Sequence, residues 1–150
     1  MRKFVEDTLQ KFSYYSTDAV NLILGTIAQE SAYGKYRRQL GNGPALGIAQ
    51  MEPATFNDII KNYLRYHPEI TERIKSVCHV NELNAINLIN NDRLAVCMCR
   101  VHYLRVAKKL PTTIEGYAAY WKQYYNTVKG KGTETEFIRN YHLYVMNDRC

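Results

Sequence analysis

Apolar residues in this chain recur at intervals of three and four residues, and no stretch alternates apolar with polar residues between turn signals. The first spacing places apolar side chains on one face of an α-helix, whereas alternation is typical of a half-buried strand. The sequence therefore predicts an all-α fold with little or no sheet. Its 150 residues are enough for one compact domain that buries its own core, covering residues 1–150.

Capping and helix-breaking residues divide the chain into expected helices. Serine, threonine and aspartate at residues 16–18 offer N-caps, and prolines mark the starts or ends of several helices. Thr112 with Glu115, and Thr133 with Glu136, have the spacing of capping boxes. We expect helices over residues 3–14, 18–31, 53–67, 69–77, 91–109, 117–125 and 137–146. A Gly-rich segment between the second and third helices is the one long loop, and such loops are often functional.

The charge of the chain is compatible with several kinds of partner. The net charge of +6 and the pI of about 9.1 attract polyanions, such as nucleic acids or the anionic bacterial wall. A nucleic-acid-binding domain would normally carry a clustered basic helix, which this sequence lacks, so we expect no nucleic-acid partner. A solvated basic face without any partner is the plainer alternative.

Neither the cysteines nor the chain start suggests special chemistry. All four cysteines are expected to be reduced thiols, mostly in the core. Cys99 and His102 share a helix face, but no second pair has metal-ligand spacing, so we expect no metal and no cofactor. The first residues contain acids where a secretory signal would have an apolar run, and no stretch reaches the roughly 18 apolar residues of a membrane span.

Glu30 is the most informative single residue. It lies seven residues after Ile23 and three after Ile27, so it continues the apolar stripe of its helix. Burial and the negative end of the helix dipole both disfavour the ionised carboxylate and should raise the pKa of Glu30. A carboxylic acid that keeps its proton near neutral pH can protonate the leaving oxygen of a glycosidic bond. The alternative is a glutamate at a fraying helix end that faces water.

Three short segments follow one another around this residue. They are Glu30-Ser31, then Gly47-Ile48-Ala49-Gln50, then Pro53-Ala54-Thr55. In order and spacing they resemble the soluble lytic transglycosylase family, which is related to goose-type lysozyme. Downstream, Tyr117-Ala118-Ala119-Tyr120-Trp121 is similar to the family's Ala-x-Ala-Tyr-Asn, with Trp121 in place of Asn.

The resemblance implies a lysozyme-like domain with Glu30 as the catalytic residue. It implies that Tyr120 reaches and orients the acid, while Trp121 leaves one polar contact unassigned. The expected substrate-binding residues are Ser31, Gly47, Ile48, Gln50, Tyr117, Tyr120 and Trp121. Gln50 suits an N-acetyl group, and Gly47 suits a close backbone approach or a positive φ. The plainer alternatives are a turn residue for Gly47 and helix-end caps for Ser31 and Gln50.

The acidic residues near Glu30 bear on the reaction. No Asp or Glu lies between Ser31 and Met51, which favours a single-acid lytic transglycosylase that forms a 1,6-anhydro ring over a two-carboxylate glycosidase. Glu52 is either a second carboxylate in the cleft or a residue that complements a helix dipole. Lys35, Arg37 and Arg38 are candidates for binding the carboxylates of the wall polymer, or form a solvated loop.

The expected partner is therefore the peptidoglycan glycan strand. Two alternatives stay open: a goose-type muramidase that hydrolyses the same bond, and a catalytically weak wall-binding or tail module. A wall-cutting motif without a signal peptide favours a bacteriophage protein. Such a protein would reside in the virion or tail beside other phage proteins, or in the host cytoplasm before its release to the cell wall.

Overall fold

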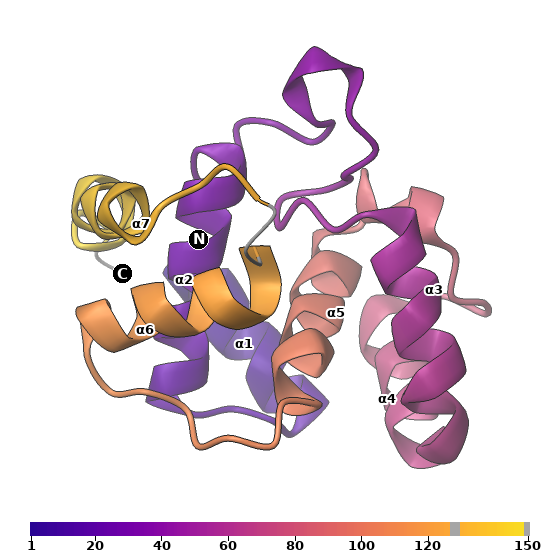
Figure 1. Ribbon diagram of the computed structural model, residues 1–150. Coiled ribbons are helices and arrows are strands. Elements are labelled where there is room, and N and C mark those ends of the chain that lie inside the picture. Colours follow the sequence, from indigo (N-terminus) through magenta and orange to yellow (C-terminus); the bar gives the residue numbers. More distant parts are fainter. Residues whose placement is uncertain (127–129, 149–150) are drawn as a thin grey trace.

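The computed structural model describes residues 1–126 and 130–148 (Figure 1). It is mostly helical (66%), with seven α-helices and no sheet over the described residues, which confirms the predicted all-α fold. The helices are α1 (Arg2–Phe12), α2 (Thr17–Ser31), α3 (Pro53–Asn62), α4 (Pro68–Cys78), α5 (Asp92–Leu104), α6 (Ile114–Trp121) and α7 (Glu134–Asn140). Short 3-10 turns cover Leu40–Asn42, Leu64–Tyr66 and Ala85–Leu88, and π-helical turns cover Lys122–Asn126 and Tyr141–Val145.

Helix α2 is the centre of the molecule. It contacts α1, α5, α6 and α7, and it is buried on nearly every side. Gly25 allows α7 to approach closely, because a Cβ atom at this position would lie 2.4 Å from the ring of Phe137. The middle of α2 is thereby packed tightly against α7.

Helix α1 packs against both α2 and α5, and four other helices lie on two sides of α5. Helices α3 and α4 lie on one side, and α6 and α7 lie on the other (Figure 1). The long loop from the end of α2 to the start of α3 passes from one side to the other at one end of the molecule. This loop is the predicted Gly-rich segment.

Several helix boundaries differ from the sequence prediction. Helices α6 and α7 each begin three residues before the predicted starts, and both change to π-helical turns before the predicted ends. Helix α3 ends at Asn62, because Tyr63 leaves helical geometry (φ −132°) and a separate 3-10 turn follows. Helix α5 ends at Leu104, five residues before the predicted end. The capping box at Thr112 is wrong: Thr113 has the extended backbone that a cap needs, and its hydroxyl accepts the Gly116 N–H. The capping box at Thr133 is confirmed.

The described cysteines, Cys78, Cys97 and Cys99, are buried free thiols, as predicted, and Cys150 lies outside the described residues. Within residues 1–126 and 130–148, no group of three or more His, Cys, Asp or Glu side chains is arranged to hold a metal ion. Over the same residues, no helix combines the length and apolar character needed to span a bilayer.

Candidate active site

A cleft of about 650 Å³ opens at the C-terminal end of α2. One wall consists of the end of α2 and residues 125–126 and 130–131, and the other is the loop between α2 and α3. The lining residues are Ala28, Gln29, Glu30, Ala32, Tyr36, Gln39, Leu40, Ala45, Gln50, Glu52, Tyr125, Asn126, Gly130, Lys131 and Asn140. The cleft is large enough to take a few sugar rings.

Glu30 contributes an acid with an unusual pKa to this cleft. The residue is half-buried, and burial of its carboxyl group raises its pKa to about 7. A hydrogen bond from Trp121 opposes this effect without reversing it. At neutral pH a large share of Glu30 is therefore protonated, as the sequence predicted.

Trp121 distinguishes the two carboxyl oxygens of Glu30. Its indole Nε1, in a fully buried side chain, donates a hydrogen bond of 2.9 Å to Glu30 Oε2. An indole N–H is only a donor, and the carbonyl oxygen of a carboxylic acid is the better acceptor. The contact therefore favours Oε2 as the carbonyl oxygen and Oε1 as the site of the acidic proton.

The two tyrosines expected in the site lie elsewhere. The Tyr120 hydroxyl donates to the backbone carbonyl of Lys108 at 3.2 Å, and the Tyr117 hydroxyl donates to Asp18 Oδ1 at 2.6 Å. Neither residue lines the cleft. The resemblance implied that Tyr120 contacts Glu30, but Trp121 makes this contact. The helix face of α6 that carries Trp121 is the one that packs against the end of α2.

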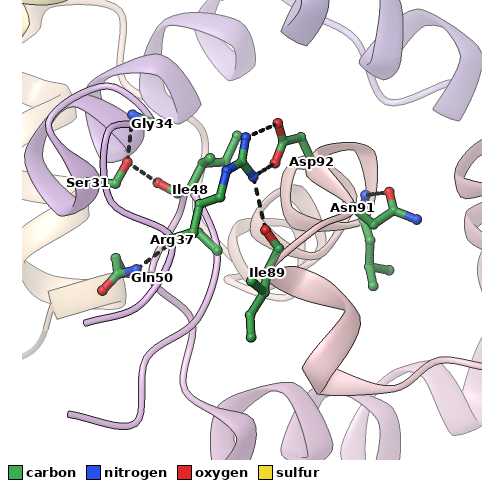
Figure 2. A network of polar contacts seen from close by, with 10 residues as sticks. Ser31, Gly34, Arg37, Ile48, Gln50, Ile89, Asn91 and Asp92 are labelled. Atoms are coloured by element: carbon green, nitrogen blue, oxygen red, sulfur yellow. Dashed lines mark hydrogen bonds and ion pairs between the residues drawn. The ribbon is translucent and has the colours of Figure 1, made fainter. Parts of the chain in front are cut away.

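Ser31 and Ile48 build the loop and do not line the cleft. Ser31 is fully buried, and its Oγ lies 2.6 Å from the Ile48 carbonyl oxygen and accepts the Gly34 N–H at 2.8 Å (Figure 2). The side chain of Ile48 is buried in the core. Ser31 therefore has the structural role that was the alternative to substrate binding. Its side chain caps the end of α2 and joins it to the loop.

Gly47 and Gln50 form a tight turn at the floor of the loop. The backbone of Gly47 has a positive φ (79°), which is one of the two roles predicted for this residue. Its backbone also approaches another chain segment closely, but that segment belongs to the protein and not to a ligand. A Cβ atom there would lie 2.5 Å from the carbonyl oxygen of Leu88. Gln50 lines the cleft, and its Nε2 donates to the Gly47 carbonyl at 2.8 Å. The amide oxygen of Gln50 has no hydrogen bond to the described residues and can accept one from a ligand.

Tyr125 is a cleft residue that the sequence reasoning missed. Its hydroxyl donates to the Ala49 carbonyl at 2.6 Å, and this bond joins the two walls. The negative charge of an ionised Glu30 is one of the causes that raise the pKa of Tyr125, so the two side chains are neighbours. The sequence could have indicated this role, because Tyr125 follows Trp121 by four residues and residues at this spacing share one helix face.

Some charged residues around the cleft form ion pairs within the protein, and others are exposed in the cleft. Arg37 is bound, because it pairs with Asp92 and donates to the Ile89 carbonyl at 3.0 Å (Figure 2). Lys131, which the prediction did not include, lines the cleft and is exposed. Glu52 also lines the cleft and is exposed.

A scan of the chain against protein-family models gives no match, and searches of curated proteins and of solved structures give none either.

Proposed function

We propose that this protein cleaves the β-1,4 bond between N-acetylmuramic acid and N-acetylglucosamine in peptidoglycan, as a lytic transglycosylase with Glu30 as its acid. The observation that carries the proposal is a carboxyl group with its pKa raised to about 7 that lines a cleft of about 650 Å³. The match of residues 30–31, 47–50 and 53–55 to the soluble lytic transglycosylase motifs supports it independently.

In the proposed reaction, Glu30 protonates the glycosidic oxygen while the bond from that oxygen to C1 breaks. The resulting carboxylate then removes the proton from the C6 hydroxyl of the same muramic acid, and this oxygen closes a 1,6-anhydro ring on C1. The attacking hydroxyl is already tethered to the sugar, which gives it a high effective concentration. Glu30 ends the cycle with its proton restored.

The other lining residues suit a sugar polymer that carries anionic peptides. Tyr36 offers a flat ring with a polar tip, Tyr125 offers a flat ring, and Gln50 offers an amide that can pair with an N-acetyl group. Lys131 offers a positive charge for a lactyl or peptide carboxylate. An inactive wall-binding module would have no use for an acid of raised pKa, which favours an enzyme over that alternative.

The proposed partner and location follow from this activity. The partner is the glycan strand, and delivery by a bacteriophage, either from the virion or tail or by release from the host cytoplasm, would bring the enzyme to the wall.

Digestion of purified peptidoglycan, followed by mass spectrometry of the soluble fragments, tests the proposal. We expect anhydro-muramic fragments from the wild type and a loss of about 10³-fold in the Glu30→Gln variant. The exposed Glu69, at the start of α4, provides the matched control Glu69→Gln, which should cut at the wild-type rate. Folded wild-type protein that releases no fragments, or an equally active Glu30→Gln variant, would contradict the proposal.

A further inference from the structure

Two carboxyl groups line the cleft among its described residues, and their surroundings differ. The carboxyl group of Glu30 is desolvated and hydrogen-bonded to Trp121. Glu52 is exposed to solvent, and its side chain has no hydrogen bond and no ion pair with the described residues. A pair of acids in contrasting environments within one cleft is the usual arrangement for a division into proton donor and proton acceptor.

The backbone of Glu52 is held firmly although its side chain has no partner. Just before it, Leu46 and Met51 exchange two backbone hydrogen bonds of 3.0 and 3.1 Å. Just after it, Pro53 begins α3, and the Glu52 carbonyl accepts the Phe56 N–H at 3.0 Å. Glu52 is therefore fixed between a closed turn and a helix, so its carboxylate is presented to the cleft from a rigid base.

Capping of α3 does not account for the side chain. Glu52 occupies the N-cap position, yet its carboxylate accepts no hydrogen bond from the first turn of the helix. A general interaction with the helix dipole is worth little at an exposed site. The same interaction is available to Glu69, which follows Pro68 at the start of α4 and does not line the cleft.

We propose that Glu52 is a second catalytic residue, which accepts a proton from a water molecule that attacks C1 of the muramic acid. This inference rests on the proposed function, because it uses the same bond and the same acid. Glu30 gives its proton to the leaving oxygen as the bond to C1 breaks, the water oxygen bonds to C1, and a water proton passes to Glu52. The net reaction consumes one water, and exchange with solvent returns both carboxyl groups to their starting states. A share of the product then has a reducing end in place of an anhydro ring.

The test is digestion of peptidoglycan in H₂¹⁸O with the full chain, followed by mass spectrometry that counts ¹⁸O-labelled reducing ends and anhydro ends separately. We expect both kinds of end from the wild type. In Glu52→Gln, which keeps the shape of the side chain but is a poor base, the ratio of labelled reducing ends to anhydro ends should fall at least about tenfold. Glu69→Gln removes an equivalent charge from a helix start and should keep the wild-type ratio.

The outcomes separate this inference from the proposed function. An unchanged ratio in Glu52→Gln, or a wild type that forms anhydro ends alone, overturns the role of Glu52 and leaves the proposed function standing. A wild type that forms only labelled reducing ends, together with a loss of those ends in Glu52→Gln, supports the role of Glu52 and overturns the anhydro route. A wild type that releases no fragments overturns both.

Discussion

The two walls of the cleft are stabilised by different kinds of interaction. The wall that carries Glu30 is built from packed helices, with Trp121 fully buried and its ring 5.3 Å from that of Phe137. The opposite wall is the loop between α2 and α3, which buries Leu46 and Ile48 in the core and is also fixed by polar contacts. These contacts are made by the buried hydroxyl of Ser31 and by the exposed pair of Arg37 with Asp92 (Figure 2).

This difference assigns different tasks to the two walls. A proton donor must keep its geometry and its low-dielectric surroundings, which a packed core provides. Residues that meet a polymer of variable composition can be carried by a loop. Changes in the helical wall should therefore alter the chemistry of the acid, whereas changes in the loop should alter the placement of the substrate.

The largest expected effect on the free energy of unfolding comes from replacing Glu30 by a residue that cannot ionise. Because its pKa is raised from 4.5 to about 7, the folded state binds the proton more tightly than the unfolded state does. Stability should therefore fall as the pH rises from about 4.5 through about 7. In Glu30→Gln this loss is absent, so the variant should gain about 3 kcal/mol over the wild type at pH 8.

Urea unfolding of both proteins across pH 4 to 8 measures the effect of Glu30. The advantage of Glu30→Gln should shrink toward zero at the acidic end. An advantage of equal size at every pH would show that the substitution acts through packing and not through the charge.

A smaller loss of stability is expected when the buried anchor of the loop is removed. Ser31→Ala leaves the Gly34 N–H and the Ile48 carbonyl without their partner, which should cost about 2 kcal/mol. Ser76→Ala, at an exposed position of α4, is the control and should cost little. Because the loop carries Gln50, KM for soluble glycan fragments should rise in Ser31→Ala. A destabilised Ser31→Ala variant with wild-type kinetics would contradict the proposal that the loop places the substrate.

Trp121→Phe tests the orienting contact in the helical wall. The hydrogen bond from Trp121 lowers the pKa of Glu30, so its removal should raise that pKa further. The alkaline limb of kcat/KM against pH should then move upward by about half a unit to one unit, or about 1 kcal/mol. Phe137→Leu disturbs the same packing without touching the acid, and its limb should stay in place.

How far the sequence could predict this site depends on whether a feature is local. The burial of Glu30, which raises the pKa of its carboxyl group, follows from the apolar stripe of one helix, and the capping box follows from Thr133 and Glu136 alone. The rotation of α6 against α2 depends on packing between distant segments. The resemblance therefore implied a contact from Tyr120 to the acid, whereas Trp121 makes it. The lack of a cap hydrogen bond to Glu52 also becomes visible only in three dimensions.

The smallest expected effect belongs to the exposed anchor of the loop. The side chains of Arg37 and Asp92 are 42% and 30% exposed, so water and salt screen their attraction. A double-mutant cycle of Arg37→Ala and Asp92→Asn should give a coupling free energy below about 1 kcal/mol, and less in high salt. A coupling above the loss measured for Ser31→Ala would reverse the comparison, because the loop would then be held mainly from its solvent-exposed side.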